Sequence, residues 1–148
     1  VEVNLGVSRH SPWVQVTAYE PYAGKLEIVV HDAPKLRVRI PTWAAADAMK
    51  VSLGNTPQRP VLDQNRYLTF VGLAPGSSVR IEYPLASRRA SETLRGQAFE
   101  AHWEGGTVVR ITPPGARYPL YTRGSQPSAN LSIEPPRFTS QTGGPIHW

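Results

Sequence analysis

The sequence contains no cysteine and only one methionine. Without cysteine, the chain cannot form a disulfide, a zinc–thiolate site or a cysteine nucleophile. This absence does not fix the compartment, because many bacterial extracellular domains also lack disulfides, so extracellular, periplasmic and cytoplasmic locations all stay open. No apolar run approaches the ~20 residues that a membrane-spanning helix needs. We therefore expect no membrane partner.

Motifs for common enzyme chemistry are also missing from the sequence. There is no G-x-S-x-G nucleophile elbow, no phosphate-binding P-loop and no dinucleotide fingerprint. The histidines show no H-x-H or H-x-x-x-H spacing, and they are His10, His31, His102 and His147. Distant histidines can still meet in space, so a metal site stays open. The simplest interpretation is four surface histidines, with no bound metal or cofactor.

The positive charge is spread rather than concentrated. The formal net charge is +5, carried mostly by arginines along the whole chain, and only Arg88 and Arg89 are adjacent in sequence. A nucleic-acid-binding domain normally gathers its basic residues into a patch or stripe within a recognisable module. The scatter is instead typical of solvated sheet faces. We expect no nucleic-acid partner.

Proline and glycine are frequent, with 15 and 12 residues among 148. Such a chain is long enough for one domain with a core, and this composition favours short strands joined by turns over long helices. From residue 124 the chain is rich in Ser, Pro and Gly and lacks apolar periodicity. We therefore predict a β-sandwich domain over residues 1–123 and an irregular tail over 124–148.

The clearest strand signal lies at Leu36–Ile40. Its apolar residues alternate with Arg37 and Arg39, and this period of two indicates one face on a core and one in water. Pro41 ends the strand because it has no N–H to donate. Trp43 follows at once, either as a plug over the end of the core or as a platform for a sugar ring.

Similar runs recur along the chain, and Pro or Gly residues punctuate them. Further strands are expected at 1–5, 14–18, 26–30, 51–53, 67–71, 79–83, 99–103, 107–111 and 119–121. Residues 6–12 and 57–60 read as connections, and 44–49 allow at most one helical turn. Residues 86–97 are polar and hard to assign, and a strand followed by a loop is one interpretation. Roughly nine to eleven short strands at this spacing predict an all-β fold, an antiparallel β-sandwich that is jelly-roll-like.

Aromatic residues near turns suggest carbohydrate binding. Pyranose rings stack on flat aromatic faces, and polar neighbours bond the hydroxyl groups. Trp13, Tyr22 and Trp103 adjoin polar loops and are our candidate carbohydrate-binding residues. The alternative for each is a core or rim position, because sandwich cores also need aromatics.

The densest acidic cluster is Glu92, Glu100 and Glu104. Glu100 and His102 are expected on one face of a strand, which makes this the most site-like local grouping. Glycoside cleavage needs two acids facing each other across a cleft. The simpler interpretation is an exposed strand whose acids balance nearby arginines, so we assign no catalytic residue.

Several short motifs follow one another in a specific order. They are Val3-Asn4-Leu5, Tyr19-Glu20-Pro21-Tyr22-Ala23-Gly24-Lys25, Leu36-Arg37-Val38-Arg39-Ile40-Pro41-Thr42-Trp43, Asn65-Arg66-Tyr67-Leu68, the Pro75-Gly76 turn before Val79–Tyr83, and Pro113-Pro114-Gly115-Ala116-Arg117-Tyr118-Pro119-Leu120-Tyr121. In this order they resemble the C-terminal β-sandwich region of glycoside hydrolase family 127-like (β-L-arabinofuranosidase-like) proteins. The resemblance covers about Val1 to Arg123. It departs from the family at Gly54-Asn55, where members often carry Asn-Gly.

The resemblance implies a non-catalytic role for this chain. Catalysis in the family belongs to a preceding (α/α)6 barrel and uses a zinc-held cysteine and a glutamate, and this chain has no cysteine and no such barrel. The resemblance thus implies an accessory sandwich that docks on a catalytic (α/α)6 domain or helps subunits associate, for example as a homodimer. From the aromatic residues we expect, in addition, a carbohydrate partner, a plant-type polysaccharide or oligosaccharide. Because Val1–Leu5 already reads as a strand, we expect the chain to begin inside a longer protein. The alternative is a small metal-dependent jelly-roll enzyme acting on glycans.

Overall fold

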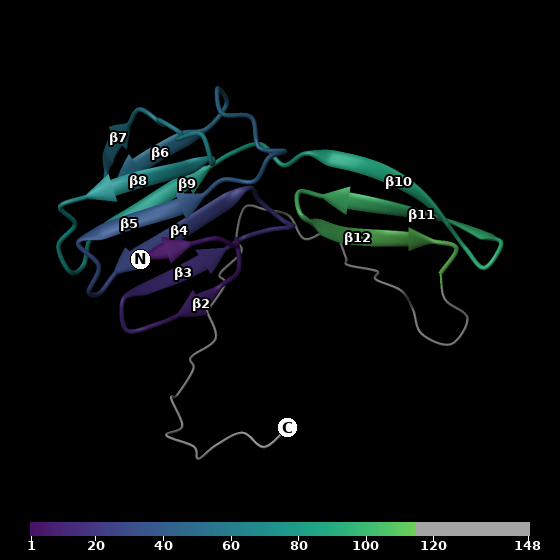
Figure 1. Cartoon of the computed structure of the whole chain (residues 1–148), viewed down its shortest axis with the longest axis horizontal. Helices are drawn as coiled ribbons and strands as arrows, with labels where there is room; N and C mark the ends of the chain where they lie inside the picture. The colour runs from purple at the N-terminus through teal and green to yellow at the C-terminus, as the bar shows by residue number, and fades with distance from the viewer. Residues whose placement is uncertain (115–148) are drawn as a thin grey trace, which may run out of the picture.

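The computed structural model describes residues 1–114, which contain strands and turns and no helix. Two sheets form a sandwich and a third sheet lies to one side of it (Figure 1). Within residues 1–114, no helix is long and apolar enough to cross a membrane. The expected strand at 119–121, the domain boundary after residue 123 and the tail at 124–148 all fall outside the described residues.

Sheet A has three strands in the order β1-β5-β8. Their bounds are β1 (Glu2–Val3), β5 (Lys35–Arg39) and β8 (Tyr67–Val71). β1 is parallel to β5, and β5 is antiparallel to β8. The predicted alternation is present, because Leu36 and Val38 are fully buried whereas Arg37 and Arg39 lie on the opposite face.

Sheet B has six antiparallel strands in the order β2-β3-β4-β9-β6-β7. Their bounds are β2 (Arg9–His10), β3 (Val14–Ala18), β4 (Lys25–Val30), β9 (Ser78–Glu82), β6 (Lys50–Leu53) and β7 (Thr56–Gln58). β4 and β9 lie at the centre of this sheet, and Ile28 on β4 is paired with Val79 on β9. Both side chains are fully buried.

The hydrophobic core lies between sheets A and B. Every buried hydrophobic residue in the described part of the chain falls between Val3 and Tyr83. The largest fully buried side chains come from both sheets, with Leu36 from sheet A and Leu26, Ile28 and Ile81 from sheet B. The predicted all-β class and the sandwich are therefore confirmed.

Sheet C follows the sandwich in the chain and projects from it (Figure 1). It is an antiparallel meander of β10 (Ser87–Leu94), β11 (Gln97–Glu104) and β12 (Thr107–Thr112). The Gly105-Gly106 turn joins β11 to β12. No residue of these three strands is buried, in contrast with the strands of the sandwich.

Two strands, β2 and β7, were not predicted from the sequence, and a third, β10, was only one interpretation of residues 86–97. β2 and β7 are edge strands, where a short or polar segment is tolerated, and Pro57 fits in β7 because an edge strand has one unpaired side. β10 pairs with β11 along its whole length. Arg95 and Gly96 form the turn between them with φ values of 51° and 79°, as a two-residue hairpin requires. Residues 44–49 form turns rather than a helical turn.

Candidate functional site

The turn after β5 holds Trp43 against the core. The Arg66 guanidinium donates to the carbonyl oxygens of Ile40 (3.3 Å), Pro41 (2.9 Å) and Ala44 (2.7 Å), and so fixes the shape of this turn. Trp43 is half-buried and packs on the core cluster, edge-on to the Tyr83 ring with centroids 5.5 Å apart. This position fits the plug interpretation of Trp43 rather than an open sugar platform.

Glu20 joins the sandwich to sheet C. Its Oε1 accepts from the Tyr83 hydroxyl (2.9 Å), and its Oε2 accepts from the backbone N–H of Gly106 (3.1 Å). A side chain at Gly105 would come within about 3.0 Å of both Glu20 and Trp43, so the turn approaches the sandwich as closely as glycine allows. Burial, followed by the charge of Glu20 and its hydrogen bond, raises the pKa of Tyr83. Glu20 therefore holds a structural contact.

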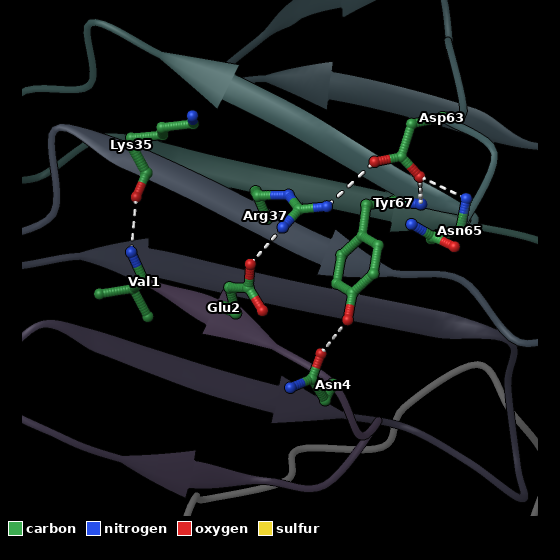
Figure 2. Close-up of polar contacts among 8 residues, drawn as sticks. All are labelled: Val1, Glu2, Asn4, Lys35, Arg37, Asp63, Asn65 and Tyr67. Carbon is green, nitrogen blue, oxygen red and sulfur yellow. Dashed lines mark hydrogen bonds and ion pairs between the residues drawn. The ribbon is translucent and has the colours of Figure 1, made fainter.

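The outer face of sheet A carries a polar network centred on Arg37 (Figure 2). The Arg37 guanidinium donates to Glu2 and to Asp63 Oδ2 (3.0 Å), and it also lies 4.2 Å from the centre of the Tyr67 ring. The hydrogen bond to Asp63 raises the pKa of Arg37. The Tyr67 hydroxyl donates to Asn4 Oδ1 (2.5 Å).

This network ties the N-terminal segment to β5 and β8. Asp63 Oδ1 accepts from the backbone N–H groups of Tyr67 and Asn65 (2.9 Å each). The hydrogen bond from the backbone N–H of Tyr67 lowers the pKa of Asp63, and Arg37 lowers it further. Desolvation of the carboxylate opposes this shift only in part. The Val1 ammonium donates to the Lys35 carbonyl (2.8 Å). Each charged group of the network thus already has a hydrogen-bond partner. The network therefore has the features of a structural contact rather than of a reactive site.

A second polar cluster covers the outer face of sheet B. The Tyr19 hydroxyl donates to Glu27 Oε2 (2.6 Å), and Lys25 Nζ lies 3.6 Å from the centre of the Tyr19 ring. Arg80 Nη2 lies 3.0 Å from Glu27 Oε1. Burial, with the hydrogen bond to Glu27, raises the pKa of Tyr19 to about 12. Desolvation works against ionisation of Glu27, but Tyr19, Lys25 and Arg80 outweigh it and lower the pKa of Glu27.

The acidic cluster on sheet C contains a serine, a histidine and a glutamate without triad geometry. Ser87 Oγ lies 2.9 Å and Glu104 Oε1 lies 3.2 Å from His102, and both contact the same nitrogen, Nε2. A catalytic triad needs the carboxylate on one ring nitrogen and the hydroxyl on the other. Glu100 pairs with Arg89 at 3.6 Å. The interpretation as a counter-charge for an arginine therefore holds for Glu100, whereas Glu104 contacts His102.

Histidines do not assemble into a metal centre with three protein ligands within residues 1–114. The rings of His10 and His31, which are far apart in sequence, lie next to each other with centroids 5.3 Å apart and planes tilted by 43°. Among the described residues, no three His, Asp or Glu side chains lie close enough together to hold a metal ion.

A groove beside the predicted site residue Trp13 lies on the open flank of the sandwich. It has a volume of about 740 Å³ and runs between β1, the edge of sheet A, and the β2–β3 hairpin at the edge of sheet B. Four exposed apolar side chains line it, and they are Val1, Leu5, Val7 and Trp13. We call this opening the flank groove.

Trp13 stands on a rigid turn in the flank groove. Its carbonyl accepts from the backbone N–H groups of His31 (2.8 Å) and Asp32 (3.0 Å). The Ser11 hydroxyl closes the same turn by donating to the Val14 carbonyl (2.8 Å) and accepting from the Val14 N–H (3.1 Å). The Trp13 side chain is nevertheless 54% exposed. The backbone is therefore fixed while the indole stays open to a ligand.

The three candidate carbohydrate-binding residues lie on three different elements. Trp13 precedes β3 and Tyr22 follows it, so β3 separates them, and Tyr22 is half-buried in its turn. Trp103 is half-buried on β11, with the Arg88 guanidinium 4.1 Å from the centre of its ring. The structure thus does not bring the three together, and sugar contact stays a prediction for each.

Sequence reasoning missed Leu5 and Val7 as partners of Trp13. Both are exposed apolar residues, at 73% and 58%, in or beside a segment that we interpreted as a polar connection. The signal that could have found them is this mismatch of an apolar residue in an otherwise polar loop.

No protein-family model matches the chain, and no curated protein sequence matches it. Among solved structures it is similar to a GH127 β-L-arabinofuranosidase from Geobacillus stearothermophilus (TM-score 0.49, 19% identity) and to a glycoside hydrolase (0.49, 14%). A further similar structure is another GH127 β-arabinofuranosidase (0.48, 16%). Each match covers 64% of this chain and 16%, 17% and 18% of the respective enzymes. The chain thus spans about a sixth of their length.

Proposed function

We propose that this chain is a non-catalytic accessory β-sandwich of a larger carbohydrate-active enzyme and that it binds a saccharide in the flank groove. The observation that carries the proposal is the exposed indole of Trp13 on a rigid turn. A fixed aromatic platform loses little conformational entropy when a sugar ring stacks on it. The volume of about 740 Å³ falls in the range of small-molecule sites.

The polar groups around Trp13 suit a neutral sugar better than a strong anion. Arg9 is an exposed cation in the lining of the groove, and Glu2 contributes a carboxylate to the same lining. The hydroxyls of Ser8 and Ser11 are already bonded to the backbone of Ala18 and Val14. Affinity therefore depends mainly on stacking and on apolar contact with Leu5 and Val7.

No observation favours catalysis by the described residues. The one group that combines serine, histidine and glutamate places two partners on the same nitrogen of His102. The metal-dependent jelly-roll enzyme likewise gains no support, because residues 1–114 bring no three ligand side chains together. The accessory role is consistent with the motif resemblance, in which the catalytic residues belong to a different domain.

Affinity gel electrophoresis with soluble arabinan, arabinogalactan, xylan and glucomannan tests the proposal. We expect at least one polysaccharide to retard the protein, with Trp13→Ala weakening the interaction at least about ten-fold, equivalent to ~1.4 kcal/mol. Trp13→Phe should keep most of the binding, because it retains an aromatic face.

The other two aromatic candidates serve as matched controls. Tyr22→Ala and Trp103→Ala should change retardation less than Trp13→Ala, because both side chains are half-buried outside the groove. Equal retardation of the wild type and Trp13→Ala would reject the flank groove as the binding site. If no polysaccharide retarded the wild type, the carbohydrate-binding role itself would be wrong.

A further inference from the structure

A pair of histidines, His10 and His31, lies on the outer face of sheet B. Directly paired residues of antiparallel strands share a face, so the registers His10↔Gln15 and Gln15↔Val29 place these three side chains on one side of the sheet. His31 follows Val29 by two residues, and its ring centroid lies 5.3 Å from that of His10. Folding of the sheet thus brings two imidazoles together.

Each of the two rings offers a nitrogen with a lone pair. His10 Nδ1 lies 3.3 Å from Gln15 Oε1, and because this oxygen can only accept, the contact assigns the proton to Nδ1 and leaves the lone pair on Nε2. His31 Nε2 is covered by protein, yet it has no hydrogen-bond partner among residues 1–114. Buried polar atoms are nearly always bonded to another group, so this nitrogen needs a partner.

We propose that His10 and His31 together bind one transition-metal cation, for which Zn²⁺ is the probe. Zn²⁺ lies about 2.0–2.1 Å from an imidazole nitrogen and prefers tetrahedral coordination. Each ring centre is then roughly 3.2 Å from the ion, and two rings at the tetrahedral angle have centres about 5 Å apart. The observed separation of 5.3 Å fits this arrangement, and the tilt of 43° excludes a face-to-face stack of the rings.

The ligand atoms select the class of ion and the kind of site. Imidazole nitrogen suits Zn²⁺, Cu²⁺ and Ni²⁺, whereas Ca²⁺ and Mg²⁺ prefer oxygen ligands. Catalytic zinc usually has three protein ligands, and residues 1–114 bring no such group together, so two histidines and solvent water make a structural site. Gln15 orients the His10 ring through Nδ1, as the outer partners of metal-bound histidines do.

A metal ion at this position links both sides of the turn that carries Trp13. The backbone N–H of His31 donates to the Trp13 carbonyl (2.8 Å). His10 directly precedes Ser11, whose hydroxyl donates to the Val14 carbonyl (2.8 Å) in the same turn. β2 is an edge strand of only two residues, so a bond through the ion adds a second attachment for it. This site does not depend on saccharide binding in the flank groove.

Isothermal titration calorimetry of the full chain with ZnCl₂, on protein without a histidine tag, tests the proposal. The absence of cysteine removes competing thiolates. We expect one Zn²⁺ per chain with micromolar affinity, weakened at least about ten-fold by His10→Ala, which replaces an exposed side chain and leaves the core intact. Gln15→Ala should weaken binding by a smaller factor, because it only frees the His10 ring.

His102→Ala is the matched control, since His102 also lies near a possible ligand, Glu104 Oε1 at 3.2 Å. It should leave Zn²⁺ affinity unchanged, and so should His147→Ala. Binding that appears only at millimolar Zn²⁺, or that is unchanged in His10→Ala, would overturn the proposal. Loss of binding in either control would assign the ion to another site and would equally overturn it.

Nuclear magnetic resonance of the wild type tests the role of His31, whose half-buried ring can affect folding when it is replaced. Zn²⁺ should shift the ring-proton signals of His10 and His31 and leave those of His102 in place, and a metal chelator should reverse the shifts. Shifts at His10 without any at His31 would contradict a shared ion.

Discussion

The sandwich and sheet C differ in what lies against their apolar side chains. In the sandwich, Leu36 on sheet A and Ile28 on sheet B are fully buried between two sheets. In sheet C, Trp103 and Ile111 face the same side, but no second sheet among the described residues packs on them. Strand pairing alone therefore does not make a core, and the two regions must draw their stability from different sources.

The difference also separates the roles of the two regions. The sandwich has its own core, so it can hold the turn of Trp13 rigidly beside the flank groove. Sheet C is linked to it by Glu20 and the Gly105-Gly106 turn, and none of the residues in its strands is buried. The first region is therefore held by a core and the second mainly by strand pairing and this contact.

The largest expected contrast comes from shortening one leucine in each region. Leu36→Ala removes a fully buried side chain and should lower the free energy of unfolding by about 3 kcal/mol. Leu94→Ala in sheet C removes a side chain that is 64% exposed, and it should cost less than about 1 kcal/mol. Urea unfolding followed by circular dichroism measures both, and similar losses would show that sheet C has a core of its own.

A smaller effect is expected where one arginine shapes the turn of Trp43. Arg66→Ala removes hydrogen bonds to three backbone carbonyls and should destabilise the protein by about 2 kcal/mol. Arg66 has a φ of 64°, so Arg66→Gly relieves backbone strain and should cost about 1 kcal/mol less than Arg66→Ala. Chemical denaturation ranks the two variants, and an equal or larger loss for Arg66→Gly would count against this account of the turn.

The contact between the two regions is tested at Glu20. Glu20→Gln weakens the bonds from Gly106 and Tyr83 and should cost about 1 kcal/mol. Glu2→Gln is the matched control, because Glu2 forms an exposed ion pair within the sandwich and should cost no more than about 0.5 kcal/mol. Hydrogen exchange should show faster exchange at the Gly106 amide in Glu20→Gln only. Unchanged exchange at Gly106 would mean that Glu20 does not hold sheet C.

The smallest effect is the alkaline pH dependence of the sandwich. The pKa of Tyr19 is about 12 in the folded chain, against an ordinary value of 10.0. A raised pKa stabilises the fold below pH 10, and this contribution is lost as pH rises from 10 to 12. The stability of Tyr19→Phe should therefore fall less steeply over that range than the stability of the wild type. Urea midpoints at pH 9 to 12 provide the comparison, and parallel curves would be inconsistent with a raised pKa.

Much of the sandwich could be predicted from the sequence because its strands bury alternate residues. The run Leu36–Ile40 shows this pattern directly, and so do Leu26, Ile28 and Val30 on β4. β2 and β7 escaped prediction, and β10 stayed only one interpretation of its segment, because pairing with a neighbour, rather than burial, makes them strands. Ser87–Leu94 has no buried position, so its sequence carries no periodic apolar signal.

The candidate site was predictable only in part, because the flank groove is a tertiary feature. Trp13 could be singled out from its polar surroundings, but its partner Leu5 approaches it only after β1 and β2 form opposite edges of the two sheets. The approach of the His10 ring to the His31 ring likewise depends on folding, since the two residues are far apart in sequence. The sequence could not distinguish Trp13 from Trp103, whose ring lies under Arg88 within a strand.

Hydrogen exchange of the wild-type chain tests the division into two regions most directly. We expect the amides of β4 and β9, whose side chains form the buried core, to be protected at least ten-fold more than the paired amides of β10, β11 and β12, which have no buried position. Equal protection in the two regions, or greater protection in sheet C, would contradict the account.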